Sequence, residues 1–427
     1  MLRGYLSPLM SSVQPGLLRA CDRFARRLGI LQQPLVSERL VAKAESRAGR
    51  PFADSAFVPA LERLVQSYNE EAALSLIGRA AARWDILRFL GNLLRFEQEE
   101  AFAPALLQAD VESPIFITGL PRSGTTFLHT LLALDLANRA PHCWETIYPY
   151  PLARGGRDRR IARVDRQFRA FENLSPGIGN LHPLTAMTPQ ECTEICAHVF
   201  QSLRFDTTHH VPSYQAWLED NGHEAAFRFH KRFLQHLQHQ NGVGQWVLKC
   251  PDHIFTLDAI RTVYPDARFV FVHRDPLSVL PSVAKLTELI RAPFTRVLDP
   301  LQIGHQVSER WDEGAQLIVQ ASQKLESGPG IFHIHYAELT AEPMASVAAL
   351  YAHFGMTLSE AARQAIGKFI LERPRGGYGV NRYSFEDSGL DPAQLRERFA
   401  YYMSAFGIAN EVKTRADRRA VPALTVA

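Results

Sequence analysis

Four short runs of apolar and β-branched residues dominate the chain from residue 114 onward, and each is followed by a loop and a helical pattern. The runs are Ile115 to Thr118, Trp246 to Leu248, Arg268 to Val272 and Ile331 to Ile334. Such alternation is typical of a parallel sheet covered by helices, with ligand groups at the carboxyl ends of the strands. We therefore predict an α/β fold whose chemistry gathers at one edge of the sheet.

Two other stretches follow the helical period and contain no convincing strand. Residues 1–105 form a predicted helical N-terminal region, in which helices begin at Pro15 and run over Leu61 to Tyr68 and Ala72 to Phe96. The mainly helical residues 139–244 separate the first two strands and are too long for a simple crossover. We expect this insert to form a substrate pocket within an α/β domain spanning 106–410, followed by a tail at 411–427.

A glycine turn follows the first apolar run and opens a helix at Phe127. Its sequence, Gly-Leu-Pro-Arg-Ser-Gly-Thr-Thr, covers residues 119–126. Backbone N–H groups of such a turn and the positive end of the helix converge on one anion site. An ATP or GTP enzyme would place a lysine where Thr125 stands, and the only cation in this loop is Arg122. The turn therefore predicts phosphate binding without the triphosphate signature.

A second phosphate motif follows the run that starts at Arg268. Arg274 stands at the end of this strand, Asp275 and Pro276 are suited to cap the next helix, and Ser282 follows Arg274 by eight residues. An arginine fork with a hydroxyl is a suitable clamp for a dianionic phosphate. The alternative is a salt bridge from Arg274 to Asp275, with Ser282 merely on a helix.

The composition of the chain limits which binding partners and which cellular compartment we expect. The 427 residues are 46% hydrophobic and 21% charged, and the net charge of +3 implies no nucleic-acid partner, so any basic surface must be local. Five irregularly spaced cysteines favour a reducing, cytoplasmic location. Cys192 and Cys196 are more typical of a core than of a metal site, so we expect no metal. No apolar stretch is long enough to predict a transmembrane segment.

The two phosphate motifs together resemble those of the sulfotransferases. Pro-Arg-Ser-Gly-Thr-Thr, residues 121–126, is similar to the loop with which that family binds the 5′-phosphosulfate of 3′-phosphoadenosine 5′-phosphosulfate (PAPS). An arginine and a serine eight residues apart hold the 3′-phosphate in the family, as Arg274 and Ser282 could here. The resemblance, to the bacterial and tyrosylprotein branch, covers residues 112–410. It implies a P-loop-like fold, PAPS as donor and adenosine 3′,5′-bisphosphate as product.

The resemblance also implies roles for single residues. The loop residues expected to bind the donor are Arg122, Ser123, Gly124, Thr125 and Thr126. Lys249, at the end of the second run, matches a catalytic lysine of the family. Tyr336 matches a tyrosine that lies against the adenine, although a strand-end tyrosine can also simply pack against a helix. Arg375 and Gly376, in a basic glycine-rich stretch, would cover the 3′-phosphate or form a surface loop.

Sulfuryl transfer needs cations at the transferring group and a base for the acceptor. Arg122, Lys249 and the loop N–H groups would supply the electrostatic stabilisation. Glu145 occupies the region of the family's glutamate base, but it could instead be a helix-start carboxylate. His182 is the rival base, whereas Glu191 is explained by a capping-box pattern that starts at Thr188.

Two other functions remain open on the sequence alone. A P-loop kinase or NTPase would share the first loop, but it would need a magnesium-binding aspartate, for which Asp252 and Asp275 are loose candidates. A non-catalytic nucleotide-binding protein on the same fold would bind the bisphosphate without transferring sulfate. The acceptor hydroxyl or amine, a small molecule or a peptide, is not identified by the sequence, and neither is the oligomeric state.

Overall fold

The computed structural model describes residues 20, 22–151, 157–324, 330–372 and 384–412. The chain divides into two compact units. Residues 112–140, 244–288 and 299–427 make up the first, which we call the sheet unit, and residues 1–111, 141–243 and 289–298 make up the second, the helical unit.

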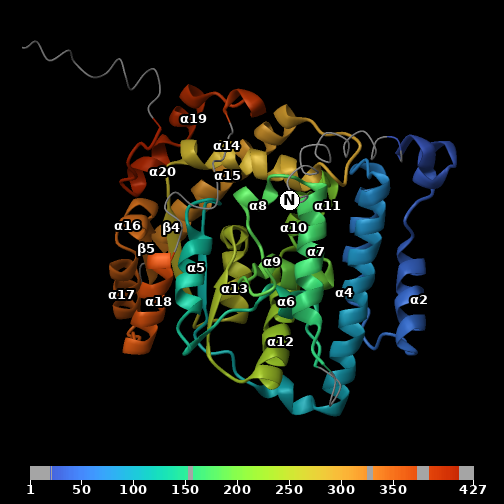
Figure 1. The fold of residues 1–427 in the computed structure, drawn as a ribbon, viewed down its shortest axis with the longest axis horizontal. Coiled ribbons are helices and arrows are strands. Elements are labelled where there is room, and N and C mark those ends of the chain that lie inside the picture. The colour runs from blue at the N-terminus through green and yellow to red at the C-terminus, as the bar shows by residue number, and fades with distance from the viewer. Residues whose placement is uncertain (1–19, 21, 152–156, 325–329, 373–383, 413–427) are drawn as a thin grey trace, which may run out of the picture. The chain divides into compact units, whose positions relative to one another are not determined.

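The sheet unit contains five parallel strands in the order β2-β3-β1-β4-β5. The strands are β1 (Ile115–Gly119), β2 (Asn138–Arg139), β3 (Gln245–Lys249), β4 (Arg268–His273) and β5 (Ile331–His335). All four predicted strands are confirmed, and the α/β fold with a parallel sheet flanked by helices is correct (Figure 1). The two-residue strand β2 was not predicted, because its polar residues carry no strand pattern.

Strand β1 lies at the centre of the sheet and is buried along its whole length. A continuous apolar run suits a strand that has helices on both of its faces. Its Ile115 and Ile117 share one core cluster with Leu128 and Leu132 of the helix that follows the glycine turn. The helices of this unit are α5 (Thr125–Ala133), η4 (Pro251–Thr256), α13 (Leu257–Val263), α14 (Pro276–Arg291), α15 (Pro300–Lys324), α16 (Tyr336–Ala341), α17 (Pro343–His353), α18 (Glu360–Glu372), η5 (Glu386–Ser388), α19 (Pro392–Arg398) and α20 (Ala400–Ala405).

The described helical unit is built from helices and 3₁₀ turns, as the sequence predicts for residues 1–105 and for the insert. Helix α4 begins after Ser75, whose Oγ accepts a hydrogen bond of 2.9 Å from the N–H of Gly78. The helix predicted from Pro15 starts outside the described residues. The elements are η1 (Ile30–Gln32), α2 (Ser37–Ala48), α3 (Val58–Glu70), α4 (Leu76–Phe102), η2 (Pro104–Gln108), α6 (Cys143–Ile147), α7 (Arg160–Leu174), α8 (Ile178–Leu181), α9 (Cys192–Cys196), η3 (Ala197–Val199), α10 (Arg204–Thr208), α11 (Pro212–Asn221) and α12 (Glu224–Asn241).

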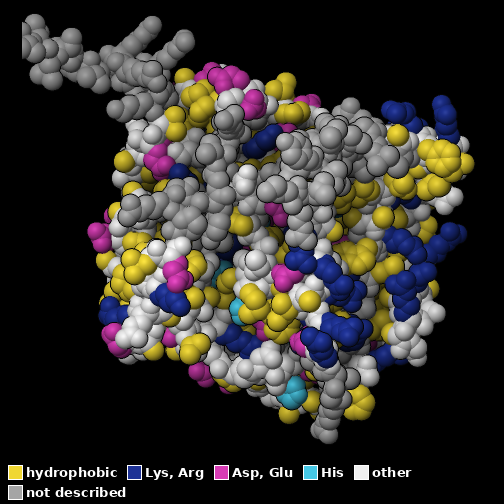
Figure 2. Space-filling view, in the orientation of Figure 1, with side chains coloured by type: hydrophobic (Ala, Val, Ile, Leu, Met, Phe, Trp, Pro, Cys, Tyr) yellow, Lys and Arg dark blue, Asp and Glu magenta, His cyan; other side chains and the backbone are white. Residues whose placement is uncertain are grey.

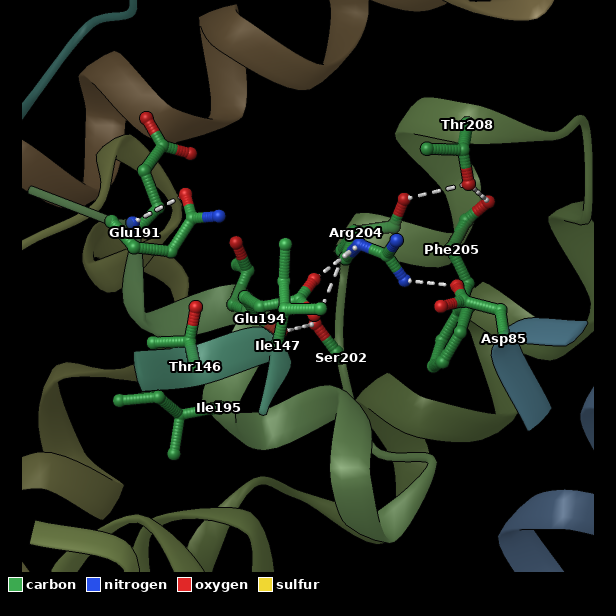
Figure 3. Close-up of polar contacts among 12 residues, drawn as sticks. Asp85, Thr146, Ile147, Glu191, Glu194, Ile195, Ser202, Arg204, Phe205 and Thr208 are labelled. Carbon is green, nitrogen blue, oxygen red and sulfur yellow. Dashed lines mark hydrogen bonds and ion pairs between the residues drawn. The ribbon is translucent and has the colours of Figure 1, made fainter. Parts of the chain in front are cut away.

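A network of buried ion pairs connects the N-terminal helices to the insert (Figure 3). Asp85 of α4 lies 2.6 Å from Arg88 and 2.7 Å from Arg204, and Glu194 of α9 lies 2.7 Å and 2.9 Å from the same two guanidinium groups. Burial alone would raise the pKa of the Asp85 carboxyl, but Arg204 and Arg88 lower that pKa to about 2. Two acids and two bases thus neutralise one another, and this network is structural.

Candidate active site

The turn between β1 and α5 has the backbone of an anion-binding loop. Gly119, Arg122 and Gly124 all have positive φ, of 139°, 61° and 96°. A Cβ on Gly119 would lie 2.3 Å from the carbonyl oxygen of Val272, so only glycine fits this close approach of two strands. Ser123 is fully buried, and its Oγ has no hydrogen-bond partner among the described residues. Within the described structure, the loop therefore contains a buried hydroxyl group whose hydrogen-bonding capacity is not satisfied by the protein.

The structure brings the two phosphate motifs together. Arg274 donates a hydrogen bond of 2.8 Å from Nη1 to the carbonyl oxygen of Arg122. The Nε of Arg122 in turn donates to the Oγ of Ser282 over 3.2 Å. Ser282 is buried on α14, while Arg274 follows β4 directly. The arginine and the serine predicted as one clamp therefore lie around the glycine turn.

The alternative salt bridge between Arg274 and Asp275 is not formed. Asp275 caps α14, because its Oδ1 accepts a hydrogen bond of 2.9 Å from the N–H of Leu277, and the predicted cap is thus confirmed. The same carboxylate also pairs with Arg396 at 3.2 Å. Its Oδ2 accepts hydrogen bonds from the N–H groups of Glu411 and Val412 at 2.8 Å and 3.3 Å.

Tyr336 lies against both motifs. Its ring centroid is 3.8 Å from the guanidinium carbon of Arg274, a cation–π contact. A Cβ added to Gly124 would lie 3.0 Å from Cδ2 of the same ring. Because Tyr336 is the first residue of α16, directly after β5, it stands at the carboxyl edge of the sheet.

A carboxylate from the C-terminal segment forms an ion pair with the guanidinium group of Arg274. Glu411 pairs with the guanidinium at 3.0 Å. Its backbone N–H is held by Asp275, the residue next to Arg274, as described above. The arginine therefore faces an anionic oxygen at the position where the sequence predicts a phosphate. No local spacing could indicate Glu411, because it stands 137 residues beyond Arg274 in the chain.

Lys249 is the last residue of β3, the strand next to β1 in the sheet. It pairs in register with Ile117, two residues before the glycine turn begins, and is only 1% exposed. The carboxyl ends of parallel strands meet at one edge, so Lys249 belongs to the same edge as the turn. This is the position that the sequence predicted for a strand-end lysine.

Glu145 belongs to the helical unit, on the short helix α6. Its Oε2 accepts a hydrogen bond of 2.9 Å from the N–H of His142 and lies 3.0 Å from the Nδ1 of that ring, which closes a capping box. Its Oε1 accepts a hydrogen bond of 2.9 Å from the side-chain amide of Asn241. The carboxylate is thus buried and fixed at the start of a helix, as the alternative interpretation of this residue expected.

The capping box predicted from Thr188 to Glu191 is wrong. Pro189 instead forms an isolated antiparallel bridge with His142, which keeps this segment extended, and α9 begins only at Cys192.

The rival base His182 follows α8 directly, in the helical unit. Arg375 and Gly376 lie outside the described residues.

Comparison with known proteins identifies the class. The model of the sulfotransferase family matches residues 114–360, more than half of the chain. The chain belongs to the sulfotransferase family. The matched region of this sulfotransferase includes both phosphate motifs, Lys249, Glu145 and Tyr336. The resemblance stated from the sequence is confirmed at the level of the family.

Three of its relatives come from mycobacteria, which fits the bacterial branch. This sulfotransferase is 23% identical over 355 residues to the omega-hydroxy-beta-dihydromenaquinone-9 sulfotransferase Stf3 of Mycobacterium bovis, covering 74% of this chain and 87% of the relative. The crystal structure of STF1 from Mycobacterium tuberculosis aligns with a TM-score of 0.75 at 30% identity, over 86% of this chain and 99% of that one. STF9 from Mycobacterium avium aligns with a TM-score of 0.78 at 25% identity, over 88% and 98%.

Within the described parts of this sulfotransferase, none of the helices combines the length and the apolar character that crossing a membrane requires.

Proposed function

We propose that this sulfotransferase transfers the sulfuryl group of PAPS to a hydroxyl group of a small-molecule acceptor. The observation that carries the proposal is the hydrogen bond from Arg274 to the carbonyl of Arg122, because it joins two separate anion-binding motifs into one site. A donor with phosphate groups at both its 3′ and 5′ positions needs such a pair of neighbouring anion sites.

The residues around the glycine turn fit PAPS. The Oγ of Ser123, which has no hydrogen-bond partner among the described residues, and the N–H groups at the start of α5 would bind the 5′-phosphosulfate. Arg274 and Ser282 would bind the 3′-phosphate, and Tyr336 would contact the adenine. The carboxylate of Glu411 on Arg274 supports this, since that guanidinium already binds an anion. Thr126 is exposed at the first turn of α5, while Arg375 and Gly376 stay predictions.

When bound, PAPS supplies an activated sulfuryl group, and the protein's task is electrostatic and positional. Arg122 and Lys249 would stabilise the negative charge that builds on the sulfonyl and bridging oxygens. Glu145 would accept the proton of the acceptor hydroxyl. His142 and Asn241 hold this carboxylate, so both would act as positioning residues for the base.

A kinase-like use of the same loop is less well supported. Thr125 stands where a nucleoside triphosphate enzyme needs a lysine. Asp275, one of the two candidates for magnesium, has both oxygens in hydrogen bonds to the protein. The match to the sulfotransferase family also favours sulfuryl transfer over a kinase-like reaction.

The acceptor is proposed from a relative. The mycobacterial Stf3 is named for a hydroxylated menaquinone, so an apolar molecule with one hydroxyl group is the acceptor class to test first. The cytoplasmic location also stays a proposal. It is supported by the small number and irregular spacing of the five cysteines.

The proposal is tested by incubating the purified protein with isotopically labelled PAPS and a panel of hydroxylated lipids, quinones, phenols and sugars. We expect one class to gain a single SO₃ group by mass spectrometry, with release of adenosine 3′,5′-bisphosphate. Arg122→Ala protein is the control for non-enzymatic transfer. If the protein binds the bisphosphate but labels nothing in any class, it is a non-catalytic member of the family. A rise in melting temperature with ATP and magnesium, but not with the bisphosphate, would contradict the proposal that PAPS is the donor.

A further inference from the structure

Helix α7 of the helical unit and Arg159 directly before it carry a row of arginines that form no ion pair within the described part of the chain. Arg159, Arg163, Arg166 and Arg169 follow one another at spacings of three or four residues and are exposed. None of the four forms an ion pair with any residue that the structure describes. Like charges at this spacing destabilise a helix. Helix stability therefore does not explain the row, and a negatively charged partner would.

Of the three acids in and next to α7, two bind other groups, and the exposed Glu172 forms no ion pair with any residue that the structure describes. Asp158 pairs with Arg160 at 3.0 Å, and Asp165 accepts a hydrogen bond of 2.8 Å from the N–H of Ala186. The apolar positions of the helix, Val164 and Phe168, pack into a core cluster. The helix thus has one packed apolar face and an outer face on which exposed arginines outnumber exposed acids.

The basic surface continues onto α4. Arg163 lies over the ring of Tyr148 at 4.4 Å, and Arg95 of α4 lies over the ring of Tyr150 at 3.9 Å. The two tyrosine rings are 6.0 Å apart. Figure 2 shows Lys and Arg side chains gathered over α7. We call the set Arg95, Arg159, Arg163, Arg166 and Arg169 the arginine face.

The helical unit also contains an exposed stretch with large apolar side chains, residues 22–30, which we call the apolar segment. Residues 22–30 leave Phe24, Leu28 and Ile30 exposed by 64%, 58% and 40%. These side chains alternate with three exposed arginines at positions 23, 26 and 27. Large apolar side chains interleaved with arginines are typical of segments that lie in a membrane interface. Figure 2 shows apolar and basic side chains together at this end of the unit, at the upper right.

The apolar segment and α7 meet at the start of α4. Phe171, near the end of α7, stacks on Phe294 with the ring centroids 5.7 Å apart. The carbonyl of Phe294 accepts a hydrogen bond of 2.8 Å from the N–H of Ser75, and Asp22 accepts one of 2.7 Å from the N–H of Leu76. Helix α7 is therefore linked through Phe294 to Ser75, and the apolar segment is linked directly to the next residue, Leu76.

We propose that the helical unit docks on anionic phospholipid membranes through the arginine face and the apolar segment. The arginines would contact phosphate headgroups, and Phe24 and Leu28 would enter the interface. The net charge of the chain is only +3, so the attraction depends on where the arginines lie rather than on total charge. Exposed apolar side chains favour a bilayer over a nucleic acid, which has no apolar phase to receive them. The proposal does not depend on sulfuryl transfer.

Flotation of the full chain with lipid vesicles tests the proposal. We expect flotation with vesicles of phosphatidylcholine containing about 30 mol% phosphatidylglycerol, but not with phosphatidylcholine alone. Replacing Arg159, Arg163, Arg166 and Arg169 with glutamine should weaken binding on the order of several hundredfold, because each arginine near such a surface contributes about fivefold. The matched control replaces four exposed basic residues of the sheet unit, Arg261, Lys324, Arg363 and Lys368, with glutamine, and it should bind like the wild type.

The apolar contribution is tested separately with Phe24→Ser and Leu28→Ser together. This variant should bind less tightly at every salt concentration while keeping the salt dependence of the wild type, since its charges are intact. Circular dichroism verifies that the variants fold. The proposal is overturned if the wild type does not float with the anionic vesicles, or if the two quadruple variants bind equally. It is also overturned if a DNA duplex competes the protein off vesicles at equal charge, because the surface would then bind any polyanion.

Discussion

Arg274 donates a hydrogen bond of 2.8 Å from its Nη1 to the backbone carbonyl oxygen of Arg122, a residue 152 positions earlier in the chain. The contact fixes the end of β4 against the glycine turn after β1, which are neighbouring strands of the sheet. Because Tyr336 stacks on the same guanidinium, three strand ends contribute to one site. The predictions for the donor site depend on this arrangement.

Replacing Arg274 with alanine should mainly impair donor binding. We expect KM for PAPS to rise about 10- to 100-fold, the usual range for loss of a charge-assisted hydrogen bond to a phosphate, with a smaller change in kcat. Arg274→Lys should recover only part of the loss, because an ammonium group lacks the planar fork that stacks on Tyr336. Steady-state kinetics with varied PAPS measure both values. An unchanged KM in the alanine variant would place the 3′-phosphate elsewhere.

Glu411 should compete with the donor for Arg274. In the Glu411→Gln variant the ion pair at 3.0 Å is lost, so PAPS and the bisphosphate should bind up to about fivefold more tightly. Calorimetric titration with the bisphosphate measures this gain. Glu313→Gln is a matched control, since Glu313 pairs with Arg310 on α15. Weaker binding in Glu411→Gln than in the control would show that the carboxylate supports the site instead of competing for it.

Arg122 and Lys249 should stabilise the transferring group. Arg122→Ala and Lys249→Ala are each expected to lower kcat on the order of 100-fold or more. Lys285→Ala, which removes an ammonium group that already pairs with Glu288 at 2.9 Å, is the control and should leave kcat unchanged. Because Lys249 is buried, its variant needs a thermal unfolding measurement beside the kinetics. Wild-type turnover in either alanine variant would reject the proposed role of that residue.

Glu145→Gln separates catalysis from capping. Glutamine can close a capping box as glutamate does, so the melting temperature should change little, whereas kcat should fall about 10²- to 10⁴-fold through loss of the base. Glu145→Ala should lose both activity and stability. His182→Ala is the companion variant and should keep its turnover. If Glu145→Gln is fully active and His182→Ala is not, the two roles are reversed.

His236 should make the helical unit less stable at alkaline pH. It is buried between Glu99 and Glu100, with its Nδ1 and Nε2 at 2.9 Å and 2.8 Å from their carboxylates. Burial alone would lower the pKa of His236, but the hydrogen bonds that its ring donates to the Glu100 and Glu99 carboxylates raise this pKa above its ordinary value. A raised pKa means that the stabilisation is complete below the pKa of the unfolded chain and is lost as pH rises through the folded pKa. Burial by itself would raise the pKa of Glu100, yet His236 and Arg232 lower it, so its contribution is lost as the solution becomes acidic.

Thermal unfolding of the wild type and of His236→Gln, followed from pH 6 to pH 9, measures this effect. At the lower end of the range the variant should be less stable by about 2 kcal/mol, a typical value for hydrogen bonds to a charged group. The difference should shrink as pH rises through the folded pKa. Parallel stability curves over the whole range would mean that His236 is not protonated between the two carboxylates.

The sequence was sufficient for four of the five strands and for the two motifs that the fold brings together. Strands that are buried on both faces, such as β1, leave a continuous apolar run, and the loops after β1 and β4 contain residue types that follow from anion binding. These are local patterns, so no knowledge of the packing was needed to find Arg122 or Arg274.

Long-range contacts account for what the sequence could not indicate. The acid nearest to Arg274 in sequence is Asp275, but that carboxylate caps α14 and holds Glu411, and the C-terminal acid pairs with Arg274 instead. The bridge between His142 and Pro189 likewise joins two segments that lie 47 residues apart in the sequence. Asn241 reaches Glu145 from 96 residues further along the chain. Such choices depend on which segments become neighbours in the fold.

The central claim, that the two phosphate motifs form a single site for one donor, is tested most directly by calorimetry with two ligands. Adenosine 3′,5′-bisphosphate and adenosine 5′-monophosphate are titrated into the wild type and into Arg274→Ala. We expect the wild type to bind the bisphosphate about 10- to 100-fold more tightly than the monophosphate, and the variant to bind both alike. Equal affinities in the wild type, or a preference that survives in Arg274→Ala, would contradict a shared site.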